Sequence, residues 1–143
     1  MTNEYNIALV IGAGLSLLAA LMHLGVIMVG PAWYRLFGAG ERFVQAAQAG
    51  RWFPAVVTAG IALILATWAA YALSGAGVIE PLPLLRPALC AITLVYLLRG
   101  LLGPFALAGT GHSVRFIVVS SAICLVYGLV HLLGVVQMWG ALA

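Results

Sequence analysis

The sequence predicts an all-α membrane protein, an antiparallel bundle of four transmembrane helices forming a single domain over residues 1–143. The 143 residues are 65% hydrophobic and only 6% charged, which is too little charge to cover the surface of a water-soluble domain of this size. Charge-free runs span Tyr5–Tyr34, Trp52–Ile79 and Phe116–Ala143, and each exceeds the ~20 residues that cross a hydrocarbon core. The period-2 alternation of a membrane barrel is missing from these runs.

The first two spans are predicted at about residues 6–30 and 53–73. The dipeptide Gly30-Pro31 should close the first span, since glycine permits a left-handed cap and proline cannot continue the hydrogen-bond ladder. Both spans carry a stripe of small residues at helical spacing. In lipid, such stripes let helices approach closely, so we expect these faces to pack against other helices.

The connection between these spans is the longest and most charged of the chain, and its residues 41–48 are expected to form a short interfacial helix. The third span is predicted at about residues 84–103, ending at the Gly103-Pro104 step, and the fourth at about 116–139.

The arginines predict the orientation. The first and third connections and the span ends beside them carry five of the six arginines: Arg35, Arg42, Arg51, Arg99 and Arg115. The positive-inside rule then puts these connections in the cytoplasm and both termini on the opposite, periplasmic side. Arginines spread in this way serve orientation, and the chain has no basic run that indicates a nucleic-acid partner.

Four blocks of the sequence resemble a group of small bacterial inner-membrane proteins with four spans: PAWYRLFGAGER (31–42), WAAYALSGAG (68–77), LPLLR (82–86) and YLLRGL (96–101). The resemblance covers most of the chain. It implies the fold and the bacterial inner membrane, and it carries over no activity.

Arg99 is the first candidate for a functional residue. Charged groups inside spans are costly and often functional, so Arg99 is a candidate to bind an anionic headgroup or a carboxylate. The alternative is an arginine in the last turn of its span that snorkels to the lipid phosphates. Tyr96 shares its helix face, and Glu41, the only acid on that side, is the expected counter-ion. Arg86 is expected to be an ordinary interfacial arginine beside a short loop.

His23 and His131 also lie within predicted spans. At 1.5 Å per residue, His23 lies about 7 Å to the cytoplasmic side of its span's centre and His131 about 5 Å to the outer side. This difference in depth argues against a shared haem, and the chain lacks a Cys–His or carboxylate pattern for a metal. No cofactor is predicted. The two histidines are expected to be hydrogen-bonded core residues, with a proton-relay role as the alternative.

These residues favour a protein that binds or transports a lipid-like or small anionic ligand within the bundle. The predicted ligand-binding residues are Arg99, Tyr96, His23, Glu41 and His131, and no catalytic residue is assigned. One alternative is an intramembrane enzyme acting on a lipid- or quinone-like substrate, ranked lower because paired titratable groups at one depth are few. Another is an accessory or assembly subunit of a larger membrane complex. Membrane lipid is the expected partner, and the small-residue faces are compatible with a homo-oligomer.

Overall fold

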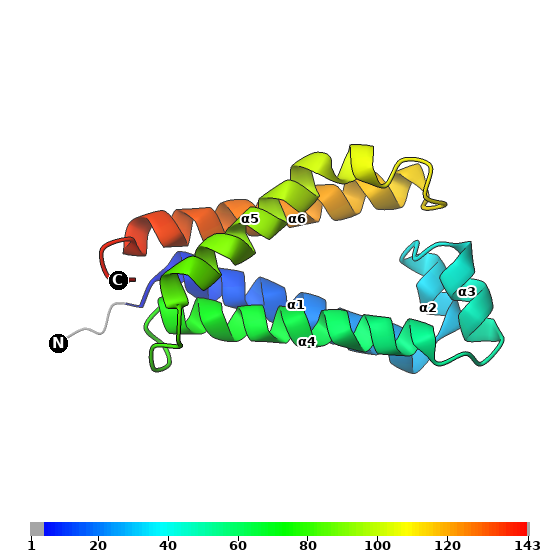
Figure 1. Cartoon of the computed structure of the whole chain (residues 1–143), viewed down its shortest axis with the longest axis horizontal. Coiled ribbons are helices and arrows are strands. Elements are labelled where there is room, and N and C mark those ends of the chain that lie inside the picture. Colours follow the sequence, from blue (N-terminus) through cyan, green and yellow to red (C-terminus); the bar gives the residue numbers. More distant parts are fainter. Residues whose placement is uncertain (1–4, 143) are drawn as a thin grey trace.

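The computed structural model describes residues 5–142, which fold into helices without any strand (Figure 1). The helices are α1 (Ile7–Val29), α2 (Pro31–Leu36), α3 (Glu41–Gln48), α4 (Phe53–Gly75), α5 (Leu85–Ala106) and α6 (Val114–Met138). Four of them, α1, α4, α5 and α6, are long and apolar enough to cross a membrane. The predicted all-α four-helix bundle is therefore confirmed, and the chain is a multi-pass membrane protein.

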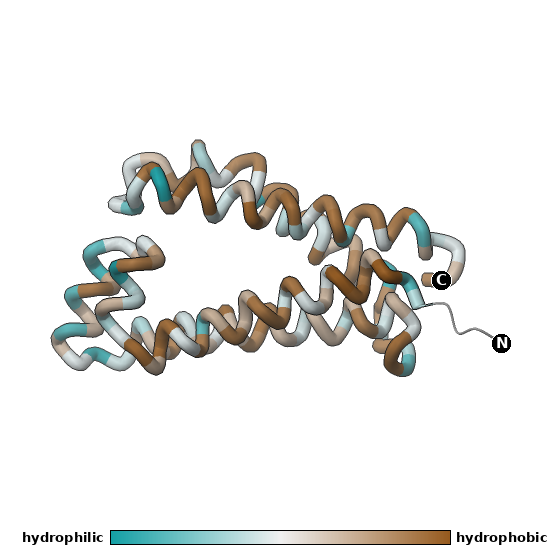
Figure 2. The backbone as a smooth tube through the Cα atoms, turned by 180° about the vertical axis from the view of Figure 1, so that it is seen from behind, coloured by the Kyte–Doolittle hydropathy of each residue, from teal (hydrophilic) through white to brown (hydrophobic). Residues whose placement is uncertain are grey.

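The four long helices form two antiparallel pairs, α1 with α4 and α5 with α6. Figure 1 shows the pairs converging at the end that carries both termini and diverging toward the end where α2 and α3 lie. Hydrophilic residues gather in α2, α3 and the loops, whereas the long helices are mostly hydrophobic (Figure 2). The two ends of the bundle therefore differ: the helix pairs pack together toward one end, and two short helices lie at the other.

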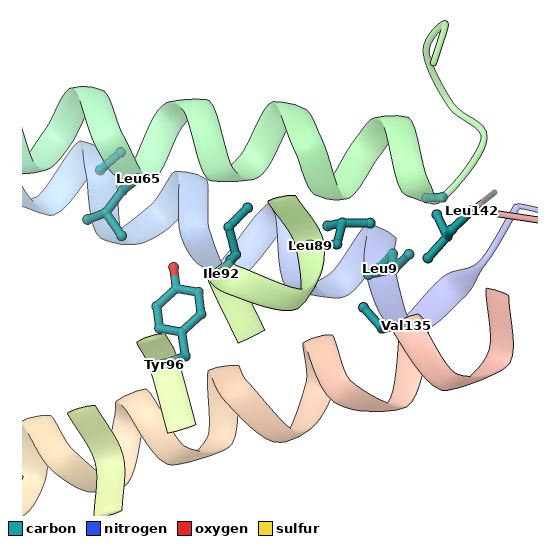
Figure 3. Close-up of a cluster of buried hydrophobic side chains, with 9 residues drawn as sticks. Leu9, Leu65, Leu89, Ile92, Tyr96, Val135 and Leu142 are labelled. Carbon is teal, nitrogen blue, oxygen red and sulfur yellow. The ribbon is translucent and has the colours of Figure 1, made fainter. Parts of the chain in front are cut away.

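The apolar core lies where the pairs converge (Figure 3). Leu9 of α1, Leu89 of α5 and Val135 of α6 are fully or almost fully buried there. The start of α1 is fixed to its neighbours by Asn6, whose backbone N–H donates to the Ala76 carbonyl at 3.1 Å. The Asn6 side chain accepts from the Leu9 N–H at 2.9 Å and so caps α1.

The two short helices form a lobe between α1 and α4, residues 31–51. The predicted helix at 41–48 is confirmed as α3, but α2 was not predicted. Gly30 (φ 80°) ends α1 as expected, and Pro31 then takes the first position of α2, where its missing N–H removes no hydrogen bond. Buried Tyr34 donates to Thr58 Oγ1 at 3.0 Å and thereby ties the lobe to α4.

The lobe also reaches the second helix pair. Gly38 has a φ of 66°, and a methyl group at its Cα would lie 2.6 Å from Cβ of Phe116 in the first turn of α6. This glycine therefore lets the α2–α3 connection lie directly on α6, across the diverging end of the bundle.

The prediction that the third span ends at Gly103 is wrong, because α5 continues to Ala106 with Pro104 inside it. Proline so near the helix end removes one hydrogen bond, the one to the Gly100 carbonyl, and the Leu107 N–H still donates to the Gly103 carbonyl at 3.0 Å. Arg99 consequently lies about 10 Å before the end of α5, at 1.5 Å per residue, and not in its last turn.

Candidate oxyanion site between α5 and α6

The guanidinium of Arg99 bridges α5 and α6. Its Nη1 donates to Ser121 Oγ at 3.0 Å and its Nη2 donates to Ser120 Oγ at 2.9 Å. The arginine is half-buried and Ser121 is buried. Two hydroxyls from one neighbouring helix therefore fix both ends of the guanidinium fork, which a freely snorkelling side chain would not require.

Glycines bring the two helices close enough for these bonds. A methyl group at Gly100 would lie 2.7 Å from the Leu125 backbone nitrogen, and one at Gly128 would lie 2.9 Å from the Leu97 backbone nitrogen. A side chain at Gly103 would collide with Arg99 Nη1 and Ser121 Oγ. Gly103, one turn after Arg99, thus leaves the space through which the guanidinium reaches α6.

The charge of Arg99 is not balanced by the described part of the chain. Within residues 5–142, no Asp or Glu forms an ion pair with it. Glu41, the expected counter-ion, is exposed at the start of α3 and accepts a hydrogen bond from Gln45 Nε2 at 3.3 Å. The predicted pairing of Arg99 with Glu41 is therefore wrong, because Glu41 belongs to the lobe and the guanidinium to the α5–α6 pair.

The site retains unused donors. A guanidinium has five N–H donors, and the two serines accept only two of them. The Ser120 hydroxyl donates a hydrogen bond to the Ile117 carbonyl at 3.3 Å, so its oxygen accepts the hydrogen bond from Arg99. The remaining N–H groups suit an acceptor with two oxygens, such as a carboxylate or a phosphate.

Tyr96 does not join this site. It is only 4% exposed, and its hydroxyl shares a hydrogen bond with Ser16 Oγ at 2.9 Å. Figure 3 shows its ring lying between the helix pairs with the hydroxyl directed away from α6. The expected Tyr96–Arg99 pair is replaced by a contact between α5 and α1, which links the two helix pairs near the centre of the bundle.

Tyr96 belongs instead to a cluster of rings in which Tyr96 and His131 are buried and the other two are partly buried. Its ring centroid lies 5.0 Å from that of Trp68, 5.5 Å from that of Tyr127 and 5.2 Å from that of His131. The contacts with Trp68 and Tyr127 are edge-to-face, a geometry that aromatic pairs favour, and the contact with His131 is tilted. The cluster is therefore part of the apolar core, at its side toward Arg99 on α5.

His131 is fully buried in that cluster. Its Nδ1 donates to the Tyr127 carbonyl at 2.8 Å, and its Nε2 is buried without a hydrogen-bond partner among the described residues. The ring packs against Gly12 of α1, where a methyl group would lie 2.9 Å from Cε1. His131 thus occupies the junction of α1 and α6.

His23 makes the same local bond but lies elsewhere. Its Nδ1 donates to the Ala19 carbonyl at 2.7 Å, and the side chain is half-buried. Within residues 5–142, no group of three or more His, Cys, Asp or Glu side chains could hold a metal ion. The five predicted ligand-binding residues are therefore dispersed: Arg99, Tyr96 and His131 line the α5–α6 side, while His23 and Glu41 belong to α1 and the lobe.

Ser120 and Ser121 are the partners that sequence reasoning missed, although a signal for them exists. In an antiparallel helix pair, residues at equal distances from the turn lie opposite each other. Close approach of Gly100 to Leu125, of Gly128 to Leu97 and of Gly103 to Ser121 shows that the helices pair about residue 112. Ser121 therefore lies opposite Gly103, and the signal is a pair of serines opposite the helical turn that follows Arg99.

Comparison of the chain with protein-family models, with curated proteins and with solved structures gave no match.

Proposed function

We propose that this multi-pass protein binds an anionic amphiphile, with the oxyanion of the amphiphile, a phosphate or a carboxylate, bound to Arg99 between α5 and α6. The observation that carries the proposal is a half-buried guanidinium held by two neutral hydroxyls, with no carboxylate paired to it in residues 5–142. An arginine inside a span costs about 2.5–3.5 kcal/mol on insertion scales. An oxyanion that accepts the free N–H groups offsets that cost, since hydrogen bonds to charged groups contribute about 1.5–3 kcal/mol.

The surroundings of Arg99 suit the apolar part of such a ligand. Three leucines close to Arg99 on α5 are exposed: Leu98, Leu101 and Leu102. Phe105 on the same helix is exposed over 80% of its surface. Acyl chains can lie against these side chains while the headgroup contacts Arg99. The apolar core, including its ring cluster, occupies the bundle beyond this site, which supports binding on one side of the membrane over passage through it.

The membrane and the orientation belong to the same proposal. We place the protein in the bacterial inner membrane, with the α2–α3 lobe and the α5–α6 connection in the cytoplasm and both termini in the periplasm. The lobe side carries Arg35, Arg42, Arg51 and Arg115, all exposed. The Arg99 site then faces the cytoplasmic leaflet.

Native mass spectrometry of the detergent-solubilised protein tests the binding. The protein is titrated with phosphatidylglycerol, palmitate and phosphatidylcholine, and Arg99→Gln is compared with Arg115→Gln, which removes the same charge from an exposed position at the same end. We expect the wild type to prefer one of the two anionic amphiphiles over phosphatidylcholine. Arg99→Gln should weaken that binding at least about tenfold, because it removes a charge-assisted hydrogen bond.

Arg115→Gln should leave the affinity close to that of the wild type. Binding of phosphatidylglycerol identifies a phosphodiester lipid as the ligand, and binding of palmitate alone identifies a carboxylate. Equal affinities of Arg99→Gln and Arg115→Gln, or no preference for an anionic amphiphile over phosphatidylcholine, contradict the proposal.

A further inference from the structure

A second polar site lies at the opposite end of the bundle. A cavity of about 760 Å³ opens there between the α4–α5 connection, the start of α5 and the C-terminal residues. Its lining includes apolar side chains such as Ile79, Leu82 and Met138 and two charged residues, Glu80 and Arg86. This volume is within the range of small-molecule sites in proteins.

Arg86 is fixed beside the cavity by Trp139, the residue that follows α6. Its guanidinium lies over the ring of Trp139, 4.9 Å from the centroid, and its Nη2 donates to the Trp139 carbonyl at 2.9 Å. Its Nε is buried and has no hydrogen-bond partner among the described residues. Arg86 was expected to be an ordinary interfacial arginine beside a short loop; the structure adds that Trp139 holds its guanidinium while one donor stays unused.

Glu80 lies on the same cavity without neutralising Arg86. The backbone carbonyl of Glu80 accepts a hydrogen bond from the Ser74 hydroxyl at 3.0 Å. The Ser74 hydroxyl oxygen accepts one from the Leu82 N–H at 2.9 Å. These two bonds fix the loop that carries the carboxylate. No ion pair joins Glu80 to Arg86, so within residues 5–142 the cavity presents one cation and one anion more than 4 Å apart.

We propose that this cavity binds a zwitterion, a molecule with an oxyanion for Arg86 and a primary ammonium group for Glu80. A single anion would be repelled by Glu80, and a single cation by Arg86. A molecule with both charges a few bonds apart satisfies both groups, and the apolar lining contacts its carbon chain. Free phosphoethanolamine and the phosphatidylethanolamine headgroup share this chemistry.

Trp139 provides a reporter for the site, because its ring contacts the Arg86 guanidinium. The protein is labelled with 5-fluorotryptophan, and the four ¹⁹F resonances are followed while phosphoethanolamine is added. Trp139→Phe assigns the resonance. We expect a saturable shift of the Trp139 resonance, whereas the signals of Trp33, Trp52 and Trp68 stay in place and show that the protein remains folded.

Matched ligands and variants define the chemistry. Inorganic phosphate alone and ethanolamine alone should bind at least about tenfold more weakly than phosphoethanolamine, since each leaves one charged group unpaired. Arg86→Gln should abolish the shift. Arg86→Lys keeps the positive charge and should retain a weaker shift, which tests the proposal even where Arg86→Gln alters the loop. Glu80→Gln should weaken phosphoethanolamine binding and strengthen the binding of inorganic phosphate, because it removes the carboxylate that repels an anion. Arg99→Gln should bind phosphoethanolamine like the wild type, which separates this site from the one proposed above.

Nanodiscs distinguish the two sources of the zwitterion. A Trp139 shift with phosphatidylethanolamine but not with free phosphoethanolamine identifies a lipid headgroup, and a shift with both identifies a site that also admits soluble zwitterions. The proposal is overturned if neither produces a shift, if Arg86→Gln still responds, or if inorganic phosphate binds as tightly as phosphoethanolamine.

Discussion

Single glycines decide where polar side chains can lie in this bundle. Gly12 of α1 provides the space for the imidazole of His131, which is fully buried and bonded to its own helix through Nδ1. Gly103 of α5 similarly leaves room for the Arg99 guanidinium between the helices. In both places, the lack of a side chain on glycine leaves space for a polar group between two helices. A larger residue would fill that space.

Gly12→Ala is expected to destabilise the junction of α1 and α6. The new methyl group would lie 2.9–3.1 Å from three ring atoms of His131, so the ring or the helix must move. We expect the free energy of unfolding to fall by about 1–3 kcal/mol, as for other overpacked cores. Thermal unfolding in detergent, followed by circular dichroism, measures the change.

Gly14→Ala is the control on the same helix, since a methyl group there has no neighbour within 4 Å. It should be neutral or slightly stabilising, because alanine favours helix over glycine. A Gly12→Ala protein as stable as Gly14→Ala would show that the His131 ring is not packed as described.

At the scale of elements, the α5–α6 pair is the unit that builds the oxyanion site. The pair is antiparallel, with Ser121 opposite Gly103, one turn after Arg99, and close approach at Gly100 and Gly128 shortens the distance that the guanidinium must span. Neither Ser120 nor Ser121 would bind Arg99 if the two helices were separated by larger side chains.

Gly100→Ala is expected to separate α5 from α6 and to weaken the site together with the fold. The methyl group would lie 2.7–2.8 Å from backbone atoms of Leu125, which cannot rotate away. We expect a loss of about 1–3 kcal/mol in the free energy of unfolding and weaker binding of the anionic amphiphile. Thermal unfolding and native mass spectrometry of the same sample measure both effects.

Gly60→Ala on α4 serves as the matched control, because a methyl group at Gly60 has no neighbour within 4 Å. If Gly100→Ala matches it in stability and in binding, close packing of α5 on α6 does not position Arg99.

The elements differ in how far the sequence predicts them. Long apolar runs predict the spans because hydropathy and length are local properties, and the amphipathic pattern of 41–48 likewise predicts α3. Gly-Pro steps were less informative: Pro31 opens α2, and Pro104 lies inside α5. A proline near a helix end removes at most one hydrogen bond, and the surrounding packing decides whether the helix continues.

At the scale of the whole molecule, the sequence predicts which residues are polar but not which of them meet. Arg99 was correctly identified as a cation in a span, yet its partners come from α6 and not from the first loop. The cavity at Arg86 forms between residues 74–87 and 138–142, and its location depends on how the helix pairs converge. Such contacts are set by helix pairing, which hydropathy does not encode.

In the whole molecule, the two arginines of α5 lie at two separate places along the helix. Arg86 and Arg99 lie on α5 about 20 Å apart along the axis, at 1.5 Å per residue, with the ring cluster and the apolar core between them. We propose an anionic amphiphile for one site and a zwitterion for the other. The two membrane surfaces would then bind chemically different ligands.

A crystal structure grown from a lipidic mesophase that contains the amphiphile selected by native mass spectrometry tests the central claim most directly. We predict an oxygen of its phosphate or carboxylate about 3 Å from an Arg99 N–H that no serine binds, with the bonds to Ser120 and Ser121 retained. Arg99 facing only water or paired with Glu41, with the amphiphile bound elsewhere, would contradict the account.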